Sequence, residues 1–345
     1  MSGYFRPAIE AMQGYAPGEQ PQGGPIVKLN TNESQYPPSP RVKEAIARFE
    51  SDRLRLYPDP LARRFREAAG KLCGVPSDWI VPVNGSDEAL TLLTRACLDK
   101  DDLMVAPTPS YLLYRVLAAI QGCRFAERSY LKSGDLPDDF LAGAKLGFVP
   151  NPNSPTGHVI SADRLLALAE SAAGLLVVDE AYADFAESNC LASVARCERL
   201  VVCRTLSKSY ALAGLRFGYV VAQPPVAETL RKIKDSYNTD AVSIAAATAA
   251  IEDADYLRIT FARIKATRTR MERELAGLGF AVTPSQANFV WCRREAPVRP
   301  VYEALKERGI LVRHLRYEGY GEGIRISVGT DEEIDLLLSE LRKIL

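Results

Sequence analysis

Short apolar runs alternate with helical stretches through the middle of the sequence, from about residue 80 to residue 222. Each run is apolar at consecutive positions, so both faces of the corresponding strand are expected to be buried. Such strands are typical of parallel sheets that carry helices on both sides. The pattern therefore predicts a large α/β domain, with strands at residues 103–106, 146–149, 175–178, 200–203 and 219–222.

The segments on either side of this region follow a helical period. Apolar residues recur at helical spacing over 42–49, and again at Leu61, Phe65, Ala68 and Leu72, which predicts two amphipathic helices. After residue 240 come an Ala-rich stretch and a long charged amphipathic helix to about residue 278. Alternating segments near 287–292 and 323–328 then flank a further helix, so the C-terminal third is expected to form a smaller α+β domain.

The last predicted helix carries both a start signal and an apolar face. Thr330 and Glu333 have the spacing of a capping box, in which each side chain bonds the backbone of the other residue. The apolar stripe that follows consists of Ile334, Leu337, Leu338, Leu341 and Leu345. We expect this stripe to face the core of the small domain.

Residues 13–40 contain so many glycines and prolines that neither a helix nor a central strand is expected there. Apolar residues near the end of this extended arm favour docking on the body of the protein or on a partner subunit. The predicted organisation is an N-terminal arm over 1–40, a large domain over 41–240 and a small domain over 241–345.

Composition excludes several classes of function. Among 345 residues, 43 Lys and Arg balance 43 Asp and Glu, so no overall charge would attract nucleic acid or anionic lipid. No run approaches the roughly 18 apolar residues of a membrane span, and the N-terminus lacks a secretory pattern. Seven cysteines without a Cys-x-x-Cys pair suit a reducing compartment, and two histidines are too few for a histidine-built zinc site. We therefore expect a cytoplasmic protein without a metal, nucleic-acid or membrane partner.

Gly85 follows a strand-like segment and precedes a helical one. The amides of Ser86 and Asp87 would then lie at a helix N-terminus, where unpaired N–H groups can hold a phosphate. The alternative is that these polar side chains only cap the helix. Because the Asp87 carboxylate would repel a phosphate, contact should come from backbone amides.

Asp179 stands at the end of a buried strand, where ligands of open α/β sheets bind. A buried carboxylate needs a protonated partner, since burying an unpaired charge is costly. The alternative is a solvated carboxylate at the strand end.

Lys208 lies just past the next apolar run, between hydroxyl-bearing residues, and Arg216 follows it at eight residues. Such a lysine can supply a reactive amine and such an arginine an anion clamp, although a lone lysine is more often a solvated surface residue. Together with the Gly85 turn and Asp179, the segment points to a phosphorylated, protonatable cofactor bound through a lysine. Pyridoxal 5'-phosphate has these properties.

These motifs, in this order, resemble the pyridoxal-phosphate aminotransferases of fold type I, most closely their histidinol-phosphate aminotransferase branch. The resemblance runs nearly end to end and includes the segments 15–18, 29–33, 57–60, 85–88, 109–114, 151–157 and 324–330. It implies an α/β fold in which a large domain holds a mainly parallel seven-stranded sheet between helices. A smaller α+β domain and an N-terminal arm complete that fold.

The resemblance also implies roles for individual residues. Lys208 would bind the cofactor covalently and shuttle the substrate proton, Asp179 would keep the ring nitrogen protonated, and Tyr182 would hydrogen-bond the ring hydroxyl oxygen. Tyr111 would stack on the ring, and Asn153 would contact the ring oxygen. The phosphate would be held by Gly85, Ser86, Asp87, Thr205, Ser207, Arg216 and, from a second subunit, Tyr57. The substrate would be held by Arg325, Tyr15 and Asn30.

Two departures from the family pattern concern the site. The family's second Asn of Asn-Asn-Pro-Thr-Gly is Ser154 here, and Asn153 is favoured for the ring contact because Ser154 is short. The arm motif also differs over residues 34–37, which concerns the substrate rather than the cofactor.

The implied protein is a homodimeric enzyme that acts on small molecules. Its implied reaction converts L-histidinol phosphate and 2-oxoglutarate into imidazole acetol phosphate and glutamate, a step of histidine biosynthesis. Alternatives on the same scaffold are an aromatic amino acid aminotransferase and a threonine-phosphate decarboxylase. A non-catalytic, cofactor-binding regulatory protein is a more distant alternative.

Overall fold

The computed structural model describes residues 3–21 and 26–345, so the part of the expected arm at 22–25 lies outside the described residues. Within them, seven strands form one sheet in the middle of the chain. The strands are β2 (Ile80–Val83), β3 (Leu103–Thr108), β4 (Arg124–Ser129), β5 (Leu146–Pro150), β6 (Leu175–Asp179), β7 (Leu200–Thr205) and β8 (Gly218–Val221). Their order is β2-β8-β7-β6-β5-β3-β4, and β8 alone runs antiparallel to its neighbours. The predicted α/β fold with a mainly parallel sheet is confirmed.

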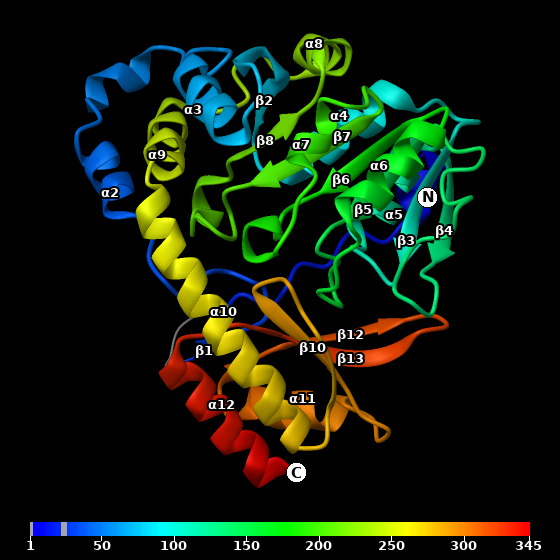
Figure 1. The fold of residues 1–345 in the computed structure, drawn as a ribbon, viewed down its shortest axis with the longest axis vertical. Helices are drawn as coiled ribbons and strands as arrows, with labels where there is room; N and C mark the ends of the chain where they lie inside the picture. The colour runs from blue at the N-terminus through cyan, green and yellow to red at the C-terminus, as the bar shows by residue number, and fades with distance from the viewer. Residues whose placement is uncertain (1–2, 22–25) are drawn as a thin grey trace.

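Both faces of this sheet are buried, as the continuous apolar runs predicted. On β6, Leu176 and Val178 enter the core on one face, whereas Val177 enters the core on the other. Helices that cover the second face are α4 (Ser86–Cys97), α5 (Leu113–Gln121) and α8 (Pro224–Ile233). The first face is covered by α2 (Pro40–Ala47), α3 (Arg63–Cys73), α6 (Ala162–Ser171), α7 (Leu191–Val194) and α9 (Ala241–Ile251). Figure 1 shows the resulting three layers.

The buried face of α3 differs from the predicted stripe. Phe65 is buried as expected, but Ala69 and Cys73 continue the buried row, while Leu61 and Leu72 are exposed. Residues i, i+4 and i+8 share one side of a helix, so the row that starts at Phe65 leaves Leu72 on the outer side. The helix therefore presents Leu72 to its surroundings, and the exposed Leu61 lies before the helix, which begins at Arg63.

The C-terminal part is a second sheet backed by helices. Its strands, within the described chain, are β9 (Ala281–Thr283), β10 (Phe289–Arg293), β12 (Arg313–Tyr317) and β13 (Gly321–Ser327), in the antiparallel order β12-β13-β10-β9. Helices α10 (Ala254–Gly277), α11 (Arg299–Glu307) and α12 (Asp331–Ile344) pack on it and close a separate core. Figure 1 places this part below the large sheet, with α10 reaching down to it.

Helix α12 begins with the predicted capping box. Thr330 Oγ1 accepts a hydrogen bond from the Glu333 amide, and the Glu333 carboxylate accepts one from the Thr330 amide. Its apolar stripe is buried from Ile334 to Leu341, but Leu345 is 44% exposed because the helix ends at Ile344. The stripe therefore stops one turn earlier than predicted.

Helix α10 joins the two cores without a break. Leu257 near its start lies in the same core as α2, α3 and α9, whereas Ile264, Met271 and Leu275 lie in the C-terminal core. A continuous helix of this length is a stiff connection. The domain boundaries at residues 40 and 240 stay predictions.

The N-terminal arm touches both parts of the molecule. Helix α1 (Pro7–Ala11) lies against α5, and Arg6 donates a hydrogen bond to the Ile120 carbonyl. Further along the arm, after residues 22–25, β1 (Val27–Lys28) pairs in parallel with β11 (Ile310–Leu311). Leu29, the next residue, is fully buried in the C-terminal core. The arm therefore passes between the large sheet and the C-terminal part (Figure 1). None of the described helices combines the length and hydropathy needed to cross a membrane.

Candidate active site

A cavity of about 210 Å³ opens where the carboxyl ends of β6 and β7 face the arm and the C-terminal sheet. Ligands of open α/β sheets bind at this edge. The structure brings most of the predicted site residues together around this cavity. They are Tyr15, Asn30, Ser86, Asp87, Tyr111, Asp179, Tyr182, Thr205, Ser207, Lys208, Arg216 and Arg325.

Asp179 ends β6 and is 5% exposed at the cavity wall. Its Oδ2 accepts a hydrogen bond from Tyr114 Oη at 3.0 Å, and its Oδ1 accepts one from the Ala181 amide at 3.3 Å. No described cation forms an ion pair with it, and burial raises the pKa of this carboxyl to about 6. A protonated ring nitrogen in the cavity would supply the missing counter-charge.

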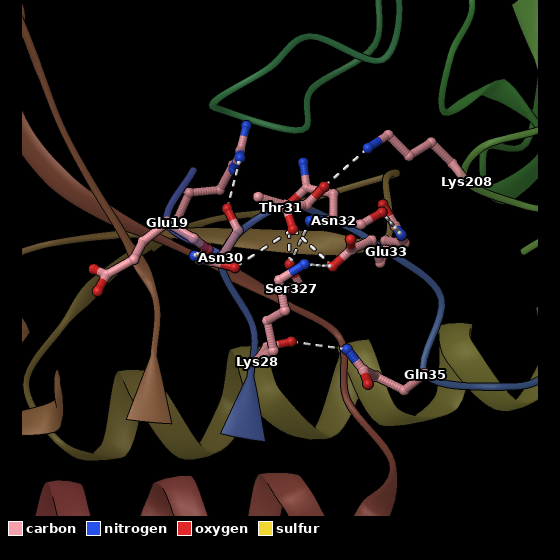
Figure 2. Close-up of polar contacts among 11 residues, drawn as sticks. Glu19, Lys28, Asn30, Thr31, Asn32, Glu33, Gln35, Lys208 and Ser327 are labelled. Carbon is pink, nitrogen blue, oxygen red and sulfur yellow. Dashed lines mark hydrogen bonds and ion pairs between the residues drawn. The ribbon is translucent and has the colours of Figure 1, made fainter. Parts of the chain in front are cut away.

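Lys208 follows β7 and points its amine toward the arm, where Nζ donates a hydrogen bond to the Thr31 carbonyl at 2.9 Å (Figure 2). Burial, and next the charge of Arg325, lower the pKa of this amine to about 8. Roughly a tenth of the amine is therefore neutral at pH 7, far more than for an ordinary lysine, and nucleophilic attack on an aldehyde requires the neutral form.

A buried ion-pair network fixes the two strand ends relative to each other. Arg204 on β7 donates from Nε to Glu180 Oε2 at 2.8 Å and from Nη1 to Asp184 Oδ1 at 2.6 Å. Ser209, next to Lys208, donates to Asp184 Oδ2 at 2.5 Å. Because Glu180 adjoins Asp179, the network connects the segment that carries the amine to the one that carries the acid. Removing one partner of such a network would leave a buried charge unpaired.

The start of α4 forms an anion cradle with the loop that precedes β8. Gly85 has φ +77°, and a Cβ there would lie 2.7 Å from Arg216 Nη2. A side chain would therefore be strained and would push the guanidinium away. Arg216 donates from Nη1 to Ser207 Oγ at 3.2 Å, and Thr205 Oγ1 donates to the same oxygen at 3.0 Å. Unpaired helix amides, hydroxyls and a guanidinium together suit a phosphate.

Aromatic rings line the cavity on both sides. Tyr111 meets Tyr15 of the arm edge to face, with ring centroids 5.6 Å apart, and its hydroxyl donates to Asp87 Oδ1 at 3.4 Å. Tyr182 follows β6 and meets Phe289 edge to face at 5.0 Å. Both Tyr111 and Tyr182 reach the cavity, so a planar ring can lie against them.

Arg325 on β13 closes the cavity from the C-terminal part. Its Nη1 donates to Ser154 Oγ at 2.9 Å and its Nη2 donates to the Asn30 carbonyl at 3.1 Å. Its buried Nε has no hydrogen-bond partner among the described residues. A guanidinium with a spare buried donor is suited to a substrate anion.

Three predicted residues do not line the cavity within one chain. Gly85 acts through the backbone of the cradle, as described above. Asn153 is buried but donates to the Pro109 carbonyl and to Thr156 Oγ1, so Ser154 is the residue of this motif whose side chain lines the cavity. Tyr57 is 80% exposed and stacks on Tyr237, with ring centroids 4.3 Å apart.

Sequence reasoning missed Tyr114, which holds Asp179, and Arg313. Arg313 lines the cavity directly across the strand pair from Arg325. Alternation along β12 turns the neighbouring His314 to another side, where its ring bonds Glu322 at 2.9 Å. No local sequence signal separates these positions, because the register of β12 on β13 decides which residue faces the cavity.

The residues present fit the cofactor expected from the sequence. Asp179 is a buried carboxylate without a counter-charge, Lys208 is a buried amine, and the cradle at Gly85 has room for a phosphate only because it lacks a Cβ. These groups match the ring nitrogen, aldehyde and phosphate of pyridoxal phosphate. Among the described residues, no cluster of His, Cys, Asp or Glu is arranged to hold a metal ion.

Comparison with known proteins agrees with this geometry. A family model described as aminotransferase class I and II matches residues 24–341. The chain belongs to this enzyme family. A histidinol-phosphate aminotransferase from Rhodopirellula baltica is 49% identical, over 96% of this chain and 93% of that protein.

Solved structures show the same fold. A histidinol-phosphate aminotransferase from Sinorhizobium meliloti, in complex with pyridoxal-5'-phosphate, has a TM-score of 0.92 at 29% identity and covers 100% of this aminotransferase and 98% of its own chain. An L-threonine-O-3-phosphate decarboxylase from Porphyromonas gingivalis has a TM-score of 0.82 at 20% identity, covering 92% of this chain and 99% of its own. The fold by itself therefore does not separate these two activities.

Proposed function

We propose that this aminotransferase uses pyridoxal 5'-phosphate to exchange an amino group between L-histidinol phosphate and 2-oxoglutarate, forming imidazole acetol phosphate and glutamate. The name of the relative that is 49% identical over nearly the whole chain supports this substrate, and so does the arrangement of arginines described below. The reaction belongs to histidine biosynthesis.

When bound, pyridoxal phosphate supplies an aldehyde that takes up the amino group and a ring that accepts negative charge. Asp179 holds a proton on the ring nitrogen, and the cradle of Gly85, Ser86 and Arg216 holds the phosphate. Lys208 accepts and returns the proton of the substrate α-carbon, for which a pKa of about 8 is suitable.

The observation that carries the substrate proposal is the pair Arg313 and Arg325, which face each other across β12 and β13 at the cavity wall. A carboxylate carries one negative charge, whereas a phosphate monoester carries close to two at neutral pH. Two facing guanidinium groups can therefore accommodate either anion. One site can thus accept glutamate in one half-reaction and histidinol phosphate in the other.

The alternatives place different demands on this pair. An aromatic amino acid offers only a carboxylate, so it would leave one arginine without an anion. Threonine phosphate carries both a phosphate and a carboxylate, so charge alone does not exclude it. Rates with histidinol phosphate, phenylalanine and threonine phosphate separate the candidates.

The decisive experiment is the visible spectrum of the purified protein before and after addition of each of these compounds. We expect a yellow absorption band from the lysine-bound cofactor, absent in Lys208→Ala, that histidinol phosphate bleaches faster than phenylalanine. Carbon dioxide release from threonine phosphate would favour the decarboxylase instead. A protein that shows no band with added pyridoxal phosphate would contradict the enzyme proposal.

We also propose that the active enzyme is a homodimer in which Tyr57 reaches the cofactor phosphate of the partner subunit. In one chain, Tyr57, Leu54 and Leu56 are more than half exposed, and exposed apolar residues of this density suit an interface. Light scattering should give twice the 37.9 kDa chain mass. Mixing Tyr57→Phe with Lys208→Ala should restore part of the activity, because a mixed dimer contains one intact site. A monomer with full activity would contradict this proposal.

A cytoplasmic location is part of the same proposal. All seven cysteines lie within the described residues and none of them forms a disulfide. This usage fits a reducing compartment.

A further inference from the structure

Asn32 lies in the arm beside the cavity, and none of the roles above uses it. It is 1% exposed and has φ +56°, a conformation that few residues other than Gly, Asn and Asp adopt. Its Nδ2 donates a hydrogen bond to Tyr182 Oη at 3.0 Å. Figure 2 shows the polar contacts that join this part of the arm to Ser327 and to Lys208.

Ser327 fixes the orientation of the Asn32 amide. The Asn32 backbone amide donates to Ser327 Oγ at 2.9 Å, and Ser327 Oγ donates its own hydrogen to Asn32 Oδ1 at 3.1 Å. Turning the amide over would place Nδ2 against Ser327 and leave the serine hydrogen and the Tyr182 oxygen without these partners. The two hydrogen bonds with Ser327 therefore orient the Asn32 side chain so that its Nδ2 donor faces Tyr182.

This arrangement decides where the Tyr182 hydroxyl hydrogen points. A phenol oxygen that accepts a hydrogen bond from an amide must donate its own hydrogen in another direction. Tyr182 lines the cavity, so that other direction lies toward the bound ligand. We propose that Asn32 is a positioning residue that turns the Tyr182 hydroxyl into a hydrogen-bond donor to the ring oxygen of the cofactor. The inference rests on the proposed function, which places the cofactor in this cavity.

Bonds that do not involve the Asn32 side chain also hold this part of the arm in place. The backbone of the segment is fixed by other bonds, because Asn288 Nδ2 donates to the Asn32 carbonyl at 3.0 Å and the Ser327 amide donates to the Leu29 carbonyl at 2.9 Å. Burial raises the pKa of Tyr182, whereas the charge of Arg325 and next the hydrogen bond from Asn32 act to lower it. The side-chain amide therefore acts on the phenol.

The variants separate this role from a structural one. Asn32→Asp keeps the shape but replaces the amide donor by an acceptor, so the Tyr182 hydrogen would turn toward residue 32. Asn32→Gly removes the side chain and tolerates φ +56°. Asn288→Ala is the matched control, because it loosens the same segment without contacting Tyr182.

The first measurement uses the cofactor-free protein, so that it does not depend on the proposed function. The measurement is the NMR spectrum of protein labelled with 13C at the tyrosine Cζ. The Tyr182 signal is identified as the one that is missing from the spectrum of Tyr182→Phe. We expect this signal to shift in Asn32→Asp and Asn32→Gly, and to stay within the line width in Asn288→Ala. Equal shifts in all three variants, or none in the Asn32 variants, would overturn the proposal.

The second measurement is a pH titration of the absorption band of the lysine-bound cofactor. Loss of a hydrogen bond donated to an anionic ring oxygen makes that oxygen more basic. We therefore expect the midpoint to rise by about one pH unit, a tenfold change, in Asn32→Asp and less in Asn32→Gly. An unchanged midpoint in Asn32→Asp contradicts the proposal. Absence of the band in the wild type would instead contradict the proposed function, which the NMR measurement does not use.

Discussion

The two sides of the cavity are built in different ways. The side formed by the large sheet, here called the floor, consists of Asp179, Lys208 and the cradle at Gly85, and buried ion pairs around Arg204 hold it together. The opposite side, here called the roof, consists of the arm and strands β12 and β13. Its arginines donate to carbonyl groups and a hydroxyl rather than to carboxylates.

This difference in construction matches a difference in function between the two sides. In the proposed function the floor groups act on the cofactor, and every amino donor needs them in the same way. The roof groups would contact the part of the substrate that varies. Hydrogen bonds to neutral carbonyls are weaker than buried ion pairs, so a substrate anion can replace them at lower cost. A rigid floor with an exchangeable roof therefore suits an enzyme that must bind two unlike substrates in turn.

The largest effect is expected on the floor. Asp179→Asn removes the counter-charge of the ring nitrogen, and we expect kcat to fall by about 10³-fold with both substrates. Steady-state kinetics with glutamate and with histidinol phosphate test this. A normal kcat would contradict the role of Asp179.

The same variant should stabilise the cofactor-free protein. The pKa of Asp179 is about 6 in the folded chain and near 3.8 when unfolded, so the folded state binds more protons between these values. Wild-type stability from this group is present below pH 4 and is lost as the pH rises through 6, by about 3 kcal/mol. Urea unfolding at pH 4 and pH 7.5 should show this loss in the wild type and not in Asp179→Asn. Equal losses in both proteins would show that another group causes them.

The roof should respond selectively. Arg313→Gln removes one of two facing charges, so we expect kcat/KM for histidinol phosphate to fall by about 30- to 100-fold and that for glutamate to fall less, because each carboxylate of glutamate carries one charge and the phosphate close to two. Arg325→Gln, the matched variant across the strand pair, should lower kcat/KM for both substrates. Equal losses for both substrates in Arg313→Gln would show that the pair does not discriminate between the two anions.

The cradle should show a smaller effect, confined to the cofactor. Gly85→Ala adds a Cβ 2.7 Å from the Arg216 guanidinium, at a backbone conformation (φ +77°, ψ 162°) that is almost exclusive to glycine. We expect the Kd for pyridoxal phosphate to rise about tenfold, and the variant to be destabilised by about 1 to 3 kcal/mol. Gly74→Ala is a control, because it has a similar φ and nothing within 4 Å of an added Cβ. Equal affinities of the two variants for pyridoxal phosphate would contradict the proposal that the cradle at Gly85 holds the cofactor phosphate.

The smallest effect is expected where the arm meets solvent. Lys306 forms an ion pair with Glu19 of the arm at 2.7 Å, and both side chains are nearly half exposed. Exposed pairs contribute little, so Lys306→Ala should change KM by less than about twofold. A tenfold change would show that charges at the outer edge of the arm, and not its carbonyl contacts with Arg313, hold the roof closed.

Local sequence signals predicted the floor well because its groups come from short segments of fixed type. Asp179 and Lys208 each end or follow a continuous apolar run, and Gly85 separates a strand from a helix. The carboxyl ends of the neighbouring parallel strands β6 and β7 meet at one edge, so Asp179 and Lys208 had to converge. The Gly85 turn reaches the same edge because the antiparallel β8 lies between β2 and β7. The assignment of individual contacts to cofactor and substrate stays a prediction.

The sequence by itself determined the α/β class, the apolar strands, the capping box of α12 and the chemical character of the site, since each depends on residue type and local spacing. Only the tertiary structure decided that Arg313 faces the cavity, that Ser154 rather than Asn153 lines it, and that Asn32 bonds Tyr182. These outcomes depend on strand register and on contacts between residues far apart in the chain. A register shift of one residue would turn Arg313 away, and no local pattern of residues specifies that register.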